Sequence, residues 1–389
     1  MIRIISAVVI VLMLFLAGCK DSVELDESMM VVGVGIKKAG DEYEIAVEAI
    51  APSDVTPNEE TVKEKSIILT TKSKTFFDAA REVIRISKRR LFFTHAIVWI
   101  IHEDLASEED MLNFLDVLRR EQMLRLNSYL FITDEDPKDI FTTDPIFSNN
   151  ISRELVSGLE SGEFVSSYPT VRARELFKML MSTMNNGYLP IIKRKEEEAG
   201  SQLTQINGTA IIKNGRKVGK LDVLESAGLM LLNNKTQGAS VRVTFDDVKG
   251  SFELLRGDTD VKTKLQGNQL KVDIHMDAVG EITEQIIEGT TMPIQISDFE
   301  KKVAGKIEKA IHKALNKLQK DFKADVTLIG MNTYRKQPKA FNKVKDKWED
   351  IFSEAEINVN VDVEITEQGL IDSPGESYKK KKNRNPYDF

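Results

Sequence analysis

The chain has 389 residues, of which 41% are hydrophobic and 30% charged, and its formal net charge is −7. A chain of this length exceeds the usual size of one hydrophobic core, so two or three water-soluble domains are expected. The acidic balance argues against nucleic acid as a partner.

The N-terminus has the pattern of an exported, lipid-anchored protein. Residues 4–17 carry no charge, and this run is shorter than the roughly 20 residues of a membrane-spanning helix, so it predicts a secretory signal. Leu16-Ala17-Gly18 leads directly into Cys19, the only cysteine of the chain, which is the pattern of a bacterial lipobox. This interpretation predicts a signal peptide over 1–18, cleavage between Gly18 and Cys19, and lipid attachment at Cys19. A plain signal peptide or short membrane helix with an incidental cysteine is the alternative.

Strand and helix patterns alternate through the first half of the chain. MVVGVGIKK and YEIAVEAIAP predict a β-hairpin, because β-branched residues flank a turn that contains Gly40 and Asp41. SIILTTK over 66–72 predicts a third strand. The helical spacing of its apolar residues, which begin with Phe76, Ala79 and Ala80, predicts a helix over 75–88.

Further along, LFFTHAIVWII over 91–101 is too apolar for a half-exposed strand and is expected at the centre of a sheet. Ser107 and Asp110 resemble a capping box that opens a helix over 108–122. The remaining elements are a strand over 128–133 and helices near 146–159 and 171–184. Strands gathered with helices between some of them predict a mixed sheet with helices packed on it.

The pattern changes after the charged run KRKEEEAGSQ over 193–202, which predicts an interdomain linker. Short strands with hairpin signals follow, including QINGTAIIK, GRKVGKLD, SVRVTF and KVDIHMDAVGEI. Ser297 and Glu300 resemble a second capping box, which opens a long helix to about Phe322 with an apolar face expected in the core. The strict alternation of AEINVNVDVEIT over 355–366 predicts a half-buried antiparallel strand.

These elements predict an α+β protein of three domains behind the signal peptide. Residues 19–193 form a mixed α/β domain, residues 203–290 a strand-rich middle domain, and residues 291–370 an α+β domain with the long amphipathic helix. Residues 371–389 are predicted to be a disordered basic tail, with contact to anionic lipid headgroups as the alternative.

Motifs of catalysis and cofactor binding are missing from the sequence. Gly33-Val34-Gly35 runs into a hairpin, so strand geometry explains these glycines better than a dinucleotide loop. His95 lies in an apolar segment and is interpreted as a buried histidine with a satisfied hydrogen bond, rather than as a ligand or a base. We find no Walker A motif, no G-x-S-x-G elbow and no metal-ligand spacing among the four histidines, His95, His102, His275 and His312. No catalytic residue, metal or cofactor is therefore predicted.

A series of segments across residues 14–370 matches one protein family in order. The series begins with GCKD, Glu24-Leu25 and VVGVGIKK, and continues with RRLFFTHAIVWIIHEDLA, in which Arg90 and His95 occupy the family's Arg and His positions, and FLDVLRREQMLRLN. The second half adds GTAIIKNGRKVGKLDVLESAGLMLL, DVTLIGMNTYRKQPKAFNKVKDKWEDIF and NVNVDVEITEQG. On these segments the chain resembles the Ger(x)C family of spore germination lipoproteins, the C subunits of germinant receptors. Lys20 departs from a common aromatic residue, and Leu328-Ile329 departs from the more usual Phe-Gly.

The resemblance implies a non-enzymatic, three-domain α+β lipoprotein on the outer face of the spore inner membrane, bound to the lipid bilayer through acylated Cys19. It also implies multi-pass A and B subunits as partners, with which family members sense nutrients and trigger germination. No catalytic residues are known to carry over from the family.

Two other classes stay open at this point. A solute-binding lipoprotein that captures a small ligand by itself would show two similar lobes, and a cell-envelope hydrolase would need a nucleophile motif. Within the receptor interpretation, RRLFFTH and the stretch over 334–348 place aromatic residues among basic ones and are candidate contact surfaces. Packing in the core or along a surface helix is the favoured interpretation of both.

Overall fold

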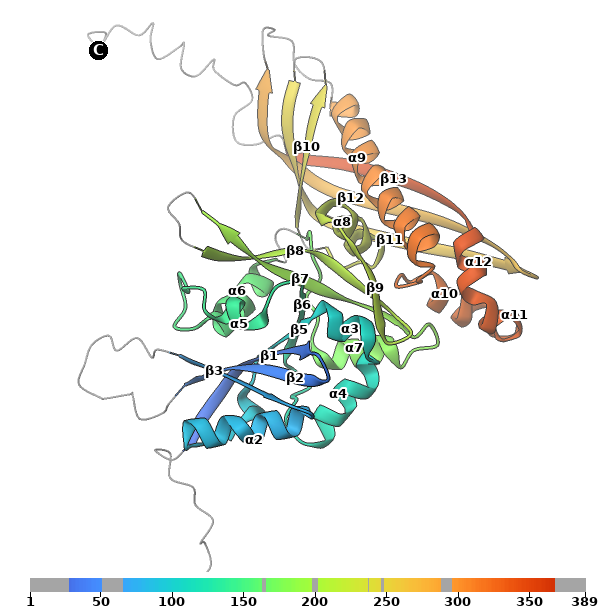
Figure 1. Ribbon diagram of the computed structural model, residues 1–389. Helices are drawn as coiled ribbons and strands as arrows, with labels where there is room; N and C mark the ends of the chain where they lie inside the picture. Colours follow the sequence, from blue (N-terminus) through green and yellow to red (C-terminus); the bar gives the residue numbers. More distant parts are fainter. Residues whose placement is uncertain are drawn as a thin grey trace, which may run out of the picture.

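The protein consists of two β-sheets with helices packed against them, which confirms the predicted α+β class (Figure 1). In the computed structural model, the described residues are 28–50, 66–162, 166–197, 202–236, 238–245, 248–287 and 296–367. The predicted signal peptide and the predicted basic tail over 371–389 lie outside these ranges. Among the helices of the described ranges, none has both the length and the apolar character needed to cross a bilayer.

The first sheet has the strand order β3-β2-β1-β5-β6-β7-β8-β9, with β4 beside β1. Its neighbours β1, β5, β6 and β7 run parallel, and antiparallel strands extend both flanks. The strands are β1 (Ser28–Ala39), β2 (Glu42–Ile50), β3 (Ile67–Ser73), β4 (Arg90–Phe92), β5 (Val98–His102), β6 (Tyr129–Thr133), β7 (Asn186–Glu196), β8 (Gln202–Lys213) and β9 (Arg216–Leu221). The predicted hairpin is confirmed, and Gly40 adopts the positive φ of 65° that its turn requires.

Helices cover both faces of this sheet, because its central strands are apolar on both sides. One face carries α2 (Phe76–Ser87), α3 (Glu103–Glu108), α4 (Met111–Arg120) and α7 (Ala173–Leu180). The other face carries α5 (Pro137–Phe141) and α6 (Ile151–Ser161). The helix predicted over 108–122 begins later than expected, because Asp110 is itself the N-cap and accepts hydrogen bonds from the backbone N–H groups of Leu112 and Asn113.

Two glycines of β1 allow α5 and α6 to approach the sheet closely. A Cβ at Gly33 would lie 2.1 Å from Oγ of Ser152, and a Cβ at Gly35 would lie 2.5 Å from Cβ of Pro137. The interpretation of Gly33-Val34-Gly35 as strand glycines is confirmed, since both lie within β1.

The segment predicted as a linker does not separate two sheets. Residues 193–196 continue β7, which pairs with β8 from Asn186 opposite Lys213 to Glu196 opposite Gln202. The charges of this segment are those of a strand whose side chains form ion pairs, and β8 and β9 complete the first sheet. Whether the chain folds as the three predicted domains is not tested by this arrangement, so the division stays a prediction.

The second sheet has the order β10-β11-β12-β13. Its strands are β10 (Ala239–Phe245), β11 (Val248–Gln266), β12 (Gln269–Ile287) and β13 (Glu356–Glu367). The alternation that predicted β13 is confirmed, but its predicted antiparallel direction is wrong, because β13 pairs in parallel with β12 from Glu356 opposite Lys271. The chain reaches β13 through a series of helices that returns it to the start of β12, and this makes the parallel direction possible.

Helices pack on one face of the second sheet, while its other face is exposed. They are α8 (Val223–Leu232), α9 (Ile296–Asn316), α10 (Ile329–Lys336), α11 (Pro338–Val344) and α12 (Trp348–Glu354). Helix α9 buries the predicted apolar stripe and continues into a π-helical turn, Lys317–Phe322. Ser297 is not its N-cap, because the helix already includes Ile296, and Glu300 accepts a hydrogen bond from the backbone N–H of Ile365 instead of closing a capping box.

One continuous apolar core links the two sheets. It contains residues from β1 and β5, from α8 and α9, and from β12. Figure 1 shows the second sheet with α9 along it in the upper part and the first sheet in the lower part. The two halves therefore hold their relative position through packing, and a cleft described below lies between them.

Candidate functional site

The predicted lipid-attachment and cleavage residues, Cys19 and Gly18, lie outside the described residues, so both stay predictions. The described chain begins at Ser28, where β1 pairs in parallel with β4 at Arg90. Strand β4 is thus paired with the described residue that lies nearest in sequence to Cys19.

The segment RRLFFTH contains β4 and does not form the continuous strand that was predicted. Ser28–Met30 pair with Arg90–Phe92, and Gly33–Ile36 pair with Val98–Ile101. The stretch between the paired segments is longer on the second strand than on β1, so residues Phe93–His95 leave the sheet as a 3-10 turn. Thr94 and His95 are exposed on this turn, and the interpretation of His95 as a buried histidine is wrong.

The aromatic residues of the stretch 334–348 face the core, as favoured from the sequence. Phe341 and Trp348 are 0% and 5% exposed, and their ring centroids lie 4.8 Å apart. Tyr334 meets Phe341 edge to face at 5.6 Å and remains 37% exposed. The lysines of the same helices point to solvent, so the alternation of aromatic and basic residues reflects two faces of short helices.

A buried carboxylate, Asp325, organises the turn that precedes α10. Oδ1 accepts hydrogen bonds from N and Oγ1 of Thr327 at 3.1 and 2.7 Å, and Oδ2 accepts from N of Gly330 at 2.8 Å and from Nε1 of Trp348 at 3.0 Å. Burial raises the pKa of Asp325, and these four hydrogen bonds offset only part of that effect. Sequence reasoning missed this group, since a lone Asp in DVTLIG carries no motif.

A cleft with a volume of about 930 Å³ lies beside Asp325, between the two halves of the protein. One wall comes from the segment before α7, from α7 itself and from the start of β7, and the other from the end of α8 and residues 325–335. Tyr188 lines this cleft, and burial raises the pKa of its hydroxyl to about 12. A hydrogen bond with the side chain of Asn233 lowers this pKa, but by less than burial raises it. The phenol is therefore neutral across the physiological range.

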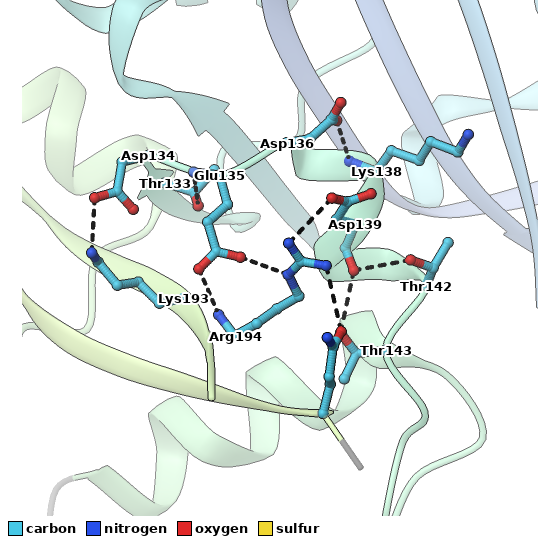
Figure 2. Close-up of polar contacts among 11 residues, drawn as sticks. Thr133, Asp134, Glu135, Asp136, Lys138, Asp139, Thr142, Thr143, Lys193 and Arg194 are labelled. Carbon is cyan, nitrogen blue, oxygen red and sulfur yellow. Dashed lines mark hydrogen bonds and ion pairs between the residues drawn. The ribbon is translucent and has the colours of Figure 1, made fainter. Parts of the chain in front are cut away.

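A second polar group lies at the carboxyl ends of the parallel strands, where ligands of open α/β sheets often bind. Figure 2 shows Arg194 of β7 between Glu135 and Asp139. Nε of Arg194 lies 2.6 Å from Oε2 of Glu135, and NH2 lies 3.2 Å from Oδ2 of Asp139. Lys193 pairs with Asp134 at 2.8 Å. These side chains neutralise one another. The acidic residues that follow β6 and the basic residues near the end of β7 therefore form one set of ion pairs.

Asp136 joins this cluster to β1. It caps α5 by accepting a hydrogen bond from the backbone N–H of Lys138 at 2.9 Å, and it pairs with Lys37. Burial alone would raise the pKa of Asp136, but the hydrogen bonds from Lys37 and from the N–H of Lys138 together with the charge of Lys37 outweigh it, so the pKa lies below its ordinary value. The pKa of Lys37 is raised: its burial acts in the opposite direction, and its pairing with Asp136 and Glu44 prevails.

The structure also brings together a histidine and two carboxylates that sequence spacing did not connect. His275 and Asp277 lie on β12, Asp362 lies on β13, and one ligand atom of each lies within 4.8 Å of the others. The set occupies the exposed face of the second sheet, not the cleft, and Nδ1 of His275 lies 3.2 Å from Nδ2 of Asn360. The parallel pairing of β12 with β13 places Asp277 opposite Asp362, and no short stretch of the sequence reveals this pairing.

Comparison with known protein families gives two matches that divide the chain in order. The family model described as spore germination protein N-terminal domain matches residues 21–194, and the one described as spore germination B3/GerAC like, C-terminal, matches residues 207–369. The chain belongs to this family of spore germination proteins. The resemblance drawn from the sequence is thereby confirmed, and membership gives the chain a role in spore germination.

Relatives within the family span nearly the whole chain. Spore germination protein B3 of Bacillus subtilis (strain 168) is 23% identical over 371 residues, which cover 94% of this chain and 98% of that protein. Spore germination protein A3 of the same organism is 25% identical and covers 92% of this chain and 95% of that protein. The crystal structure of the GerBC protein has a TM-score of 0.58 and 20% identity, and it covers 89% of this chain and 100% of that chain. The mixed α+β fold is thus shared with this structure.

Proposed function

We propose that the chain is a lipid-anchored, non-enzymatic subunit of a nutrient germinant receptor, which acts with multi-pass A and B subunits on the outer face of the spore inner membrane. The observation that carries the proposal is that the lipobox is followed in sequence by the two family matches. The first family match begins at Asp21, two residues after the lipobox cysteine, and the second ends at residue 369. The sequence similarity to spore germination proteins B3, KC and A3 supports the same role.

The anchor explains how a modest interface suffices for such a subunit. The nine Cα-to-Cα steps from Cys19 to Ser28 span at most about 32 Å. A body held this close to the bilayer meets membrane partners at a high effective concentration. Strand β4 pairs with Ser28, the first described residue after the anchor, and its exposed neighbours Arg90, Thr94 and His95 are our candidate contact surface.

A solute-binding lipoprotein that acts alone is the alternative class. Such proteins are built from two similar lobes, whereas the two sheets here differ in strand number, strand order and direction. The ion pairs at the carboxyl ends of the parallel strands also give no support to the hydrolase class, because the carboxylates are paired with basic side chains.

The test replaces Cys19 with Ala in the full chain in sporulating cells, with Ser22→Ala as the matched control in the same segment. We expect the Cys19→Ala protein to leave the membrane fraction and nutrient-triggered germination to fall, while Ser22→Ala behaves as the parent. A tagged parent chain is expected to co-purify with multi-pass membrane proteins from spore membranes. A Cys19→Ala protein that stays membrane-bound and fully active contradicts the anchor, and a parent chain that purifies alone contradicts the receptor assembly.

A further inference from the structure

The cleft beside Asp325 combines cations without ion-pair partners and buried amides with unpaired oxygens. Its volume of about 930 Å³ lies within the range of small-molecule sites. It does not belong to the proposed contact surface. Its contents therefore require an explanation of their own.

Basic side chains face the cleft from both walls. Lys178 comes from α7, Lys235 follows α8, and Arg335 lies in α10. Among the described residues, none of these three forms an ion pair. Placing like charges around one hollow without counter-ions is unfavourable, and an anion bound between them would relieve it.

The acidic groups of the lining are occupied. Glu175 accepts a hydrogen bond from the backbone N–H of Arg172 at 2.8 Å and caps α7. Asp325 accepts four hydrogen bonds from its own turn and from Trp348. Glu160 accepts from the hydroxyl of Tyr129 at 3.3 Å. In the described part of the chain, none of these carboxylates lies within ion-pair distance of Lys178, Lys235 or Arg335.

Two buried asparagines at the lining each lack a hydrogen-bond donor. Asn186 and Asn233 are only 6% and 9% exposed. Nδ2 of Asn186 donates to the carbonyl of Asp325 at 3.4 Å, and Nδ2 of Asn233 donates to the carbonyl of Val326 at 3.1 Å. Oδ1 of each accepts no hydrogen bond in the described part of the chain. A buried acceptor without a donor is costly, so a ligand donor is favoured there once a small rotation of the amide turns its oxygen, which is inaccessible in this structure, toward the cleft.

We infer that this cleft binds a small, hydrophilic anion that carries both an acid group and a hydrogen-bond donor. The acid group lies between the cations of the two walls, and the donor satisfies an asparagine oxygen at the lining. Because the walls come from both halves of the protein, bound ligand would tie these halves together. The inference goes beyond the proposed receptor role and depends on neither the anchor nor the A and B subunits.

The test is calorimetry on the purified full chain in detergent at constant ionic strength, with citrate, tricarballylate and inorganic phosphate as probes. Citrate and tricarballylate carry the same three carboxylates, but only citrate has a hydroxyl donor. We expect saturable binding of citrate at one site and weaker binding of tricarballylate. Equal affinity for these two acids would overturn the assignment of the asparagine oxygens.

Matched double variants distinguish the cleft from general attraction to a basic surface. Lys178→Gln/Arg335→Gln removes one cation from each wall and should lower the affinity for citrate at least about tenfold. Lys336→Gln/Lys339→Gln removes the same charge from exposed neighbouring positions that do not line the cleft, and it should leave the affinity unchanged. The proposal is overturned if neither citrate nor phosphate binds saturably, or if both double variants weaken binding equally. Thermal unfolding of each variant without ligand verifies that the fold is intact.

Discussion

Nε1 of Trp348 donates a hydrogen bond to Oδ2 of Asp325 over 3.0 Å, and both residues are almost fully buried. The contact fastens the start of α12 to the turn before α10. It also lies beside Gly330, where a Cβ would come within 2.5 Å of the same carboxylate oxygen and 3.0 Å from the indole nitrogen. Asp325, Gly330 and Trp348 thus form one packed unit at the border of the cleft.

Replacing Asp325 with Asn should destabilise the protein by roughly 2 kcal/mol or more at pH 7, because one amide cannot accept the four hydrogen bonds that the carboxylate accepts. Urea unfolding measures the change. Trp348→Phe removes a single donor and should cost less than Asp325→Asn. An Asn variant as stable as the parent protein would show that the carboxylate does not hold this unit together.

The same substitution predicts a change in pH dependence. Burial raises the folded-state pKa of Asp325 above its unfolded value of about 3.9, so between these two pKa values the folded state binds more protons than the unfolded state. The contribution of Asp325 to the free energy of unfolding therefore falls as the pH rises from about 4 through the folded pKa. The difference in stability between parent and Asp325→Asn should shrink over this window, and a difference that grows with pH would contradict the raised pKa.

Local patterns predicted most strands and helices, whereas features set by distant partners were missed. Helix α8 was not predicted, because VLESAGLMLL is apolar on several sides and has no polar face to give a period; its surroundings are α9 and the sheet. Strand β11 was missed because charged residues such as Asp258, Asp260 and Lys262 alternate on its exposed face. The direction of β13 depends on where the chain returns from α12, which no short window contains.

The functional residues show the same contrast between local patterns, which were predicted, and distant partners, which were missed. The lone cysteine and its neighbours predicted an anchor from local chemistry. The cleft, in contrast, joins Lys178 with Arg335 and Asn186 with the carbonyl of Asp325, and these residues are far apart in sequence. In the sequence these residues resemble ordinary surface lysines, arginines and asparagines, and only the folded structure shows that they line one cleft.

Replacing Lys37 with Met should lower stability by no more than about 1 kcal/mol at pH 7, since the side chains of Lys37 and Asp136 are 22% and 32% exposed and solvent screens the pair. The lowered pKa of Asp136 gives a contribution that is present above the unfolded pKa of about 3.9 and is lost as the pH falls through the folded pKa. Urea titrations from pH 7 downward should therefore show the two proteins converging in acid. Lys74→Met, at an exposed lysine without an ion pair in the described ranges, is the control and should change little.

Glu48→Gln should destabilise the first sheet by roughly 2 kcal/mol, because Glu48 is 0% exposed and both of its oxygens accept hydrogen bonds. Oε1 accepts from N of Ile151 at 3.0 Å and from Oγ of Ser66 at 2.9 Å, and Oε2 accepts from N of Ser152 at 2.9 Å. The carboxylate thereby satisfies the start of α6 and lies where the helix dipole favours a negative charge. Glu82→Gln on the surface of α2 is the comparison and should cost less than about 0.5 kcal/mol. Equal denaturant midpoints for the two variants would contradict this role of Glu48.

Gly228→Ala should cost roughly 1–3 kcal/mol, because α8 and α9 approach so closely that a Cβ at Gly228 would lie 2.2 Å from the carbonyl oxygen of Ala310. A backbone oxygen inside a helix cannot move aside as a flexible side chain can, so the helices must separate and lose contacts in the core. Gly305 on α9 provides the matched control, since a Cβ there meets no atom within 4 Å. Gly305→Ala should stabilise the protein by up to about 1 kcal/mol through the higher helix propensity of alanine. Thermal and urea unfolding of the two variants should therefore shift in opposite directions, and a Gly228→Ala protein that shifts with Gly305→Ala would show that the α8–α9 contact is looser than described.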